Sequence, residues 1–187
     1  AVKGKGTGRL SEEKTGDVLQ VLFPLGNGFK IAPEQKKVML LGGGMGSVIF
    51  PSVMREYPDK EFYVYLGFSN KDVIVTDDIY KNAKSLVVTT DDGSNGTGGF
   101  ITDKVAEDLN RTDPDIVLSC GPTPLYRTMK KVFADFAKPV IVSLEGHMCC
   151  GIGACYVCAC KIKKGDSVYT MRVCKDGPAF DLNEVEL

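Results

Sequence analysis

From residue 37 onward, short apolar runs alternate with longer segments of mixed polarity. The runs have the length and composition of buried strands. They predict strands at Val38–Leu41, Phe62–Leu66, Leu86–Thr90, Ile116–Ser119 and Val140–Leu144. The intervening segments predict helices at approximately Val48–Tyr57, Asp72–Tyr80, Phe100–Leu109 and Pro124–Phe136. Repeated strand–helix units indicate an α/β fold with a parallel, doubly wound sheet and right-handed crossovers.

The first 29 residues follow a different pattern. They are rich in glycine and irregular, with one apolar stretch, Val18–Phe23, between turn sequences at Thr15–Asp17 and Leu25–Gly28. This stretch predicts a strand that belongs to a fragment of an antiparallel unit. The fragment is too short to bury a core by itself.

The composition narrows the function classes. A chain of 187 residues with 43% hydrophobic and 25% charged residues has room for one or two globular domains. Its net charge of −1 gives no basic field for nucleic acid or anionic lipid, so we expect neither as a partner. The longest apolar runs are far shorter than a membrane span, and no signal peptide opens the chain. We therefore expect a soluble, cytoplasmic protein.

Glycines and polar residues follow four of the five predicted strands. The carboxyl ends of parallel strands share one rim of the sheet, where ligands bind, so these segments together predict a nucleotide-sized crevice. The candidate residues are Gly42, Gly43, Gly44, Gly46, Asp91, Asp92, Gly93, Cys120, Gly121 and Pro122.

Each segment also has a plainer interpretation. The run Gly42–Gly46 would let backbone N–H groups approach a pyrophosphate, but it is not GxGxxG and would also suit a tight turn. The segment Gly67–Asn70 lacks the acidic residue expected after a second strand. By itself, Asp91–Gly96 has the composition of a surface turn. Cys120 is either a small buried residue or a soft side chain that faces a redox ring.

Six of the seven cysteines lie between Cys149 and Cys174 and mark a smaller C-terminal module. Clustered cysteines without an export signal more often bind metal or do redox work than form disulfides. The only histidine, His147, fits a solvated turn, which argues against a His-based catalytic triad or zinc site.

The spacing of four cysteines is the strongest motif. Cys150, Cys155 and Cys158 are separated by four and two residues, and Cys174 follows from the far strand of a hairpin. This is the plant-type spacing of a 2Fe–2S cluster, and small residues between the first two can turn N–H groups toward the sulfurs. A tetrahedral zinc site is the alternative. Cys149 and Cys160 fall outside the spacing.

With these residues in view, the chain resembles the electron-transfer subunits of dihydroorotate dehydrogenase B, in the ferredoxin–NADP reductase-like superfamily. The resemblance covers essentially the whole chain. It rests on GKGTGRLSEEKTGD, PLGNGF, LLGGGMG, LGFSNKDV, TTDDGSNGTGGFITD, SCGPTPL, VSLEGHMCCGIGACYVCACK and RVCKDGPAFD. It implies a remnant FAD-binding β-barrel in residues 1–35, a Rossmann-like NAD-binding domain in 36–144 and a 2Fe–2S module in 145–187.

The resemblance also implies roles for residues. The cluster ligands would be Cys150, Cys155, Cys158 and Cys174. Gly6 and Thr7 match a short segment that touches FAD, and Gly121 and Pro122 would lie near the place where the flavin and nicotinamide rings meet.

Two features depart from the family pattern. Family members carry an upstream Arg-x-x-Ser/Thr strand that grips the flavin, and Ala1 falls after that point. The proline that follows the glycine run is displaced, since Ser47–Phe50 precedes Pro51. We therefore expect about half of the flavin barrel to be missing and FAD to bind weakly.

The expected function is electron transfer in pyrimidine biosynthesis, as a subunit of an NAD-dependent oxidoreductase. Electrons would pass from an FMN-containing dihydroorotate dehydrogenase subunit through the 2Fe–2S cluster and FAD to NAD+, with no catalytic residue on this chain. The alternatives are the small flavin/iron–sulfur subunit of another NAD(P)H-dependent oxidoreductase and a non-enzymatic, zinc-stabilised binding module.

Overall fold

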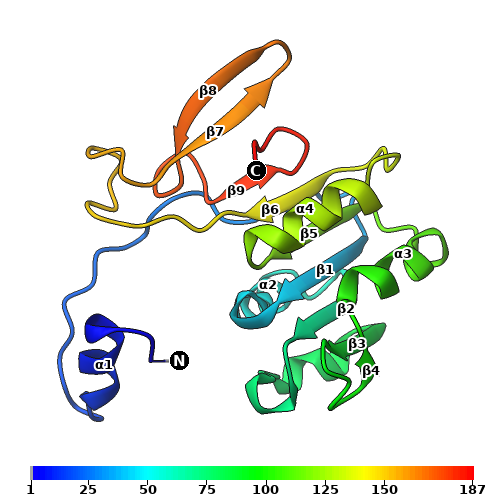
Figure 1. Ribbon diagram of the computed structural model, residues 1–187, viewed down its shortest axis with the longest axis horizontal. Helices are drawn as coiled ribbons and strands as arrows, with labels where there is room; N and C mark the ends of the chain where they lie inside the picture. Colours follow the sequence, from blue (N-terminus) through cyan, green and yellow to red (C-terminus); the bar gives the residue numbers. More distant parts are fainter. Residues whose placement is uncertain (1) are drawn as a thin grey trace.

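The computed structural model describes residues 2–187, and a seven-stranded sheet forms its centre (Figure 1). The strand order is β4-β3-β2-β1-β5-β6-β9, and every pairing is parallel except the one between β6 and β9. The predicted α/β fold with a parallel sheet is therefore confirmed. The strands are β1 (Lys37–Gly43), β2 (Glu61–Phe68), β3 (Ser85–Thr90), β4 (Thr97–Gly98), β5 (Ile116–Cys120), β6 (Val140–Ser143) and β9 (Ala179–Asp181).

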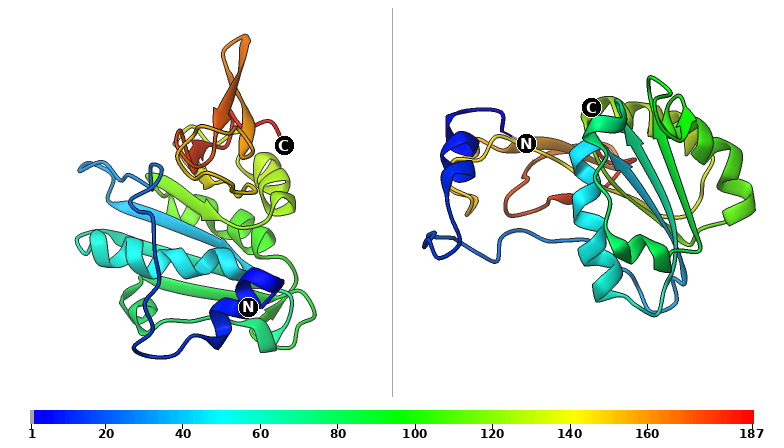
Figure 2. Two further views of the ribbon diagram at one scale, coloured as in Figure 1. Left: turned by 90° about the vertical axis from the view of Figure 1, so that its left-hand side faces the viewer. Right: turned by 90° about the horizontal axis from the view of Figure 1, so that it is seen from below.

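Helices cover both faces of this sheet, so the central strands are buried on both sides (Figures 1 and 2). On one face, α3 (Ile101–Thr112) and α4 (Thr123–Val132) pack on Met39 and Leu41 of β1. On the other face, α2 (Phe50–Glu56) packs on Val38 and Leu40. Because side chains alternate along a strand, one continuous apolar run serves both cores.

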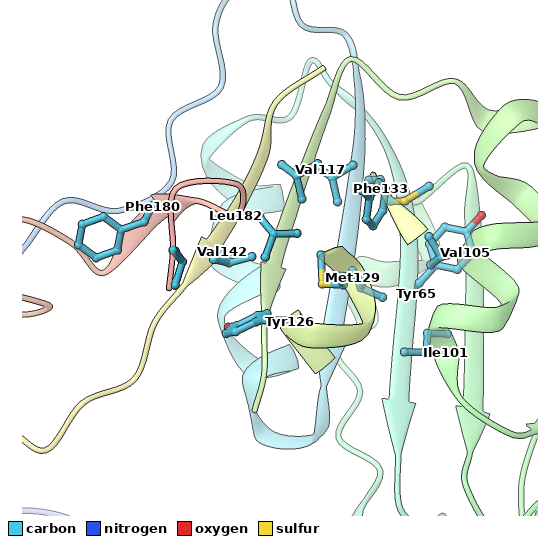
Figure 3. Close-up of a cluster of buried hydrophobic side chains, with 14 of the residues drawn as sticks. Tyr65, Ile101, Val105, Val117, Tyr126, Met129, Phe133, Val142, Phe180 and Leu182 are labelled. Atoms are coloured by element: carbon cyan, nitrogen blue, oxygen red, sulfur yellow. The ribbon is translucent and has the colours of Figure 1, made fainter. Parts of the chain in front are cut away.

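The core on the α3–α4 side reaches from the sheet into the C-terminal module (Figure 3). Met129 of α4 lies fully buried at its centre, while Phe180 and Leu182 extend it beyond β6. Tyr126 lies at the end of α4 that is nearer the carboxyl rim. The same hydrophobic cluster therefore holds the seven-stranded sheet and the C-terminal, cysteine-bearing module together.

One predicted helix is wrong. Where the sequence predicts a helix over Asp72–Tyr80, the structure has two short 3-10 turns, η2 (Lys71–Val73) and η3 (Asp78–Asn82). Val73–Thr76, at the end of η2 and in the link to η3, are four consecutive β-branched residues, which lose rotamer freedom in a helix. The Asn70 and Asp77 side chains also accept backbone N–H groups two residues ahead, which begins a new turn at each.

The N-terminal segment also differs from expectation. The structure has a helix, α1 (Lys5–Glu12), in the part expected to be irregular, and it stands away from the sheet (Figure 1). The strand predicted at Val18–Phe23 is wrong, because these residues are exposed and unpaired. Within residues 2–35 the β pairing is limited to an isolated bridge between Asn27 and Pro178. An apolar alternation alone cannot form a strand when no neighbouring strand satisfies its backbone.

The C-terminal module is a hairpin with long flanking loops. Strands β7 (Ala159–Lys164) and β8 (Ser167–Arg172) pair in antiparallel fashion and project from the sheet (Figure 1). Ile162 of β7 is fully buried against the main core. The chain then re-enters the main sheet as β9, so both ends of the module are anchored at the same sheet edge.

No helix in residues 2–187 is both long enough and apolar enough to cross a lipid bilayer.

We predict that truncating Leu40 destabilises the fold while truncating Val18 does not. Leu40 is fully buried in the central strand, so Leu40→Ala should lower the free energy of unfolding by about 2–5 kcal/mol. Val18 is 92% exposed, so Val18→Ala should change it by less than about 0.5 kcal/mol. Urea unfolding followed by circular dichroism measures both. A matching loss for Val18→Ala would contradict the unpaired N-terminal segment.

Candidate functional site

A cavity of about 640 Å³ opens at the carboxyl rim of the sheet. It lies where the loops after β1, β2, β3 and β5 come together, as expected for a doubly wound sheet. The residues that line it from these loops are Gly43, Gly44, Met45, Gly46, Gly67, Phe68, Ser69, Val73, Asp91, Gly121 and Pro122.

Six of the residues expected at a nucleotide site line this cavity: Gly43, Gly44, Gly46, Asp91, Gly121 and Pro122. Four others, Gly42, Asp92, Gly93 and Cys120, are not part of its lining. Cys120 is buried in the core on the α2 side, where burial raises the pKa of its thiol. Gly6 and Thr7 lie exposed on α1, although Lys3 just before this helix reaches the cavity.

The cavity also includes residues that the sequence reasoning missed. They belong to the first turn of α3, to α4 and to the segment after β6: Phe100, Ile101, Thr102, Asp103, Pro124, Leu125, Thr128 and Glu145. The position of Phe100 at the start of a predicted helix could have suggested the first of these, because parallel strands place the start of the next helix at the same rim.

Glycine is required where two loops of this rim pack together. A Cβ on Gly46 would overlap the Cys120 carbonyl oxygen, and one on Gly43 would lie 2.9 Å from the Pro122 side chain. Gly44 has a φ of +53°, which other residues rarely adopt. The glycine run therefore lets the turn after β1 lie directly against the turn after β5.

Tyr126 fixes the turn after β5. Its buried hydroxyl accepts a hydrogen bond from the Gly121 N–H at 2.9 Å and donates one to the Ser143 carbonyl at 2.6 Å. Burial raises the pKa of this hydroxyl well above its usual range, so it stays protonated and able to donate. The end of β6, where the C-terminal module begins, is thereby tied to the floor of the cavity.

The second candidate site is the loop that carries the clustered cysteines. Cys150 lies at its start, and the Ala154 N–H donates to the Cys150 sulfur at 3.3 Å. Backbone N–H groups of Cys155, Ile152 and Ala154, together with the Cys155 thiol, lower the pKa of Cys150 to about 6. A thiol with this environment is readily deprotonated, as a metal-binding cysteine must be.

The other two predicted ligands form a second pair. Cys158 and Cys174 are both buried, and the Cys174 N–H donates to the Cys158 sulfur at 3.5 Å. This hydrogen bond lowers the pKa of Cys158, whereas burial raises the pKa of Cys174. Cys174 lies two residues after the end of β8, so the hairpin returns the chain to the cysteine loop.

The four thiols therefore form two pairs, Cys150 with Cys155 and Cys158 with Cys174. Across residues 2–187, no three His, Cys, Asp or Glu side chains converge as they would around a single metal ion. Two pairs with N–H groups turned toward their sulfurs fit a binuclear iron–sulfur cluster better than a tetrahedral zinc site.

The remaining candidates lie outside these pairs. Cys149 is exposed, with its thiol against that of Cys155. Cys160 is half-buried and packs on the core, and His147 is exposed.

Comparison with known proteins matches both the C-terminal module by itself and the chain as a whole. Residues 145–186 match the family described as the iron–sulfur cluster binding domain of dihydroorotate dehydrogenase B. The dihydroorotate dehydrogenase B (NAD(+)) electron transfer subunit of Caldanaerobacter subterraneus subsp. tengcongensis is 38% identical over 98% of this chain and 72% of its own length. The corresponding subunit of Geobacillus sp. strain WCH70 is 37% identical over 99% of this chain and 72% of its own length.

This chain belongs to the family of dihydroorotate dehydrogenase B electron transfer subunits. The resemblance seen in the sequence is confirmed, and so is an iron–sulfur cluster as a cofactor of the family.

A solved structure also shares the fold. A chain of the NADH-dependent reduced ferredoxin–NADP oxidoreductase, studied for flavin-based electron bifurcation, superposes with a TM-score of 0.83 at 32% identity. The match covers 99% of this chain and 66% of that one. The ferredoxin reductase-like architecture expected from the sequence is therefore confirmed.

We predict that Gly46→Ala damages the cavity. The added methyl group would meet the Cys120 backbone, which has no flexible side chain to move aside, so the free energy of unfolding should fall by about 1–3 kcal/mol. NADH binding, measured by fluorescence titration, should weaken by about tenfold or more as the two turns separate. Gly8→Ala, in open space on α1, is the matched control and should change neither quantity. Unchanged stability and binding in Gly46→Ala would refute the close packing of the two turns.

Proposed function

We propose that this chain carries electrons between a partner flavoprotein dihydroorotate dehydrogenase and NAD+, as a subunit of an NAD-dependent oxidoreductase. The observation that carries the proposal is the pair-wise arrangement of four thiols, in which backbone N–H groups donate hydrogen bonds to the Cys150 and Cys158 sulfurs. A 2Fe–2S cluster exchanges single electrons, while a flavin can pass them on in pairs as a hydride to NAD+.

The chain's own residues divide this work between its two sites. Cys150, Cys155, Cys158 and Cys174 would hold the cluster. The turn Gly43–Gly46 would let backbone N–H groups approach the pyrophosphate of NAD+, and Gly121 and Pro122 would border the nicotinamide end. A further nucleotide contact would come from Asp91, which also lines the cavity.

The flavin would lie between the N-terminal segment and the cavity. Lys3 reaches the cavity lining, which supports this position for the segment that includes Gly6 and Thr7. The Thr7 hydroxyl accepts hydrogen bonds from the N–H groups of Lys3 and Gly4, so it also holds the start of α1 in shape.

The exposed edge of the cysteine loop would meet the partner subunit. Ile152 and Tyr156 are 56% and 51% exposed, beside the exposed Cys155. Apolar side chains beside a redox centre suit a protein–protein contact, because burying them excludes water while the centre stays near the surface. Since all seven cysteines are free, we also propose a reducing, cytoplasmic location.

A second candidate is a subunit of another NAD(P)H-dependent flavin and iron–sulfur oxidoreductase. The fold match with the NADH-dependent reduced ferredoxin–NADP oxidoreductase favours it. The electron donor separates the two, because only the first requires dihydroorotate and its flavoprotein.

We expect four cysteines, and only four, to be needed for the cluster. Cys150→Ser or Cys174→Ser should abolish most of the iron content and the visible absorbance, since each removes a ligand. Cys149→Ser and Cys160→Ser should keep both. Iron analysis and one visible spectrum of each purified variant provide the measurement. Bleaching by Cys149→Ser together with an intact Cys150→Ser would show that the ligand register is shifted by one.

Coupled turnover tests the partner. Dihydroorotate should reduce NAD+ only when the cognate flavoprotein subunit is present and flavin is supplied. Ile152→Glu should lower this coupled rate by about tenfold without changing the iron content, because it places a charge in the contact. Val168→Glu changes a comparably exposed residue on the hairpin and should leave the rate unaltered. NADH formation from dihydroorotate by this chain alone would overturn the division of roles.

A further inference from the structure

Arg172, the last residue of β8, joins the two segments that carry the cysteines. Its guanidinium donates to the Gly153 carbonyl at 3.1 Å, inside the loop that contains Cys150 and Cys155. It also lies 5.0 Å from the centre of the Tyr156 ring in the same loop. One side chain from the hairpin thus contacts the cysteine loop at two places.

The Gly153 carbonyl belongs to a particular peptide group. The other end of that group is the Ala154 N–H, which donates to the Cys150 sulfur at 3.3 Å. Because a peptide group is planar and rigid, an anchor on its oxygen also fixes the direction of its hydrogen. The positive guanidinium further polarises the peptide, which strengthens the N–H as a donor.

Asp176 holds the guanidinium in place. Its carboxylate accepts hydrogen bonds from Nε and Nη2 of Arg172 at 2.8 and 3.0 Å, and another from the Arg172 backbone N–H at 2.8 Å. These hydrogen bonds hold the pKa of Asp176 below its usual range, so the pair stays ionised. A planar fork can satisfy a carboxylate and a carbonyl together, whereas a lysine ammonium cannot reproduce this geometry.

We propose that Arg172 is a positioning residue that sets the reduction potential of the cluster by holding the Ala154 N–H on the Cys150 sulfur. The inference rests on the proposed function, since it requires the 2Fe–2S cluster there. Reduction adds negative charge that the sulfurs share, and hydrogen bonds to the sulfurs stabilise that charge. Loss of the anchor therefore makes the cluster harder to reduce.

The test is a dye-mediated visible titration of the full, cluster-loaded chain, with iron per chain measured in parallel. Arg172→Lys keeps the charge but loses the fork, and Arg172→Gln loses both. At the wild-type midpoint potential, each should show an about tenfold lower ratio of reduced to oxidised cluster, or about 59 mV for a one-electron couple. The charge control is Lys161→Gln on β7, whose ammonium donates a hydrogen bond to the Thr170 hydroxyl of the same hairpin and should change the ratio less than about twofold.

The outcomes separate a positioning role from a purely structural or electrostatic one. A wild-type potential in iron-loaded Arg172→Lys would overturn the inference and leave the proposed function intact. If Arg172→Lys retains no iron, Asp176→Asn replaces it, because this variant loosens the guanidinium without removing it. We expect a shift of about threefold in the same direction there, and an unshifted potential would overturn the inference. A wild-type chain that binds no iron would instead overturn the proposed function and, with it, this inference.

Discussion

The antiparallel pairing of β9 with β6 is the constraint on which the arrangement of the two sites depends. The chain leaves the main sheet after Ser143, forms the cysteine loop and hairpin, and returns at Ala179, which pairs with Ser143 itself. The whole C-terminal module thus begins and ends at one edge of the main sheet. The Tyr126 hydroxyl hydrogen-bonds both the Ser143 carbonyl and the Gly121 N–H. The end of β6 is therefore fixed to the cavity at the carboxyl rim, which Gly121 lines. Electron transfer between two sites requires this kind of fixed separation.

The sequence predicted the parts of the fold that depend on local pattern. Apolar runs located five of the six parallel strands because a strand buried on both faces has little choice of residue type. The prediction from sequence was wrong where strand pairing or side-chain capping determines the local structure. Val18–Phe23 has the composition of a strand but no partner, and β9 is too short to be recognised without knowing that β6 lies beside it. At Asp72–Tyr80, side-chain capping by Asn70 and Asp77 outweighed the helical length of the segment.

The same distinction applies to the sites. Three of the four predicted cluster cysteines are close in sequence, so their spacing alone indicated the chemistry. The cavity combines residues from seven separate segments, and the six that the sequence predicted all lie at or just after the ends of strands. Leu125 and Thr128 reach it from within α4 through tertiary packing, which no local pattern reports. Cys120 shows the converse, since its place at a strand end suggested the rim while the pleat turned its side chain into the core.

The two cysteine pairs differ in their exposure to solvent and in the environment of their sulfurs. Cys158 and Cys174 are buried, and burial raises the pKa of Cys174, whereas the hydrogen bond from the Cys174 N–H lowers the pKa of Cys158. Cys150 instead receives several backbone N–H groups, and its lowered pKa of about 6 shows that negative charge is stabilised there. This is the pair beside the exposed Ile152 and Tyr156. The pair that lies nearer the surface is therefore also the pair that a partner protein can approach.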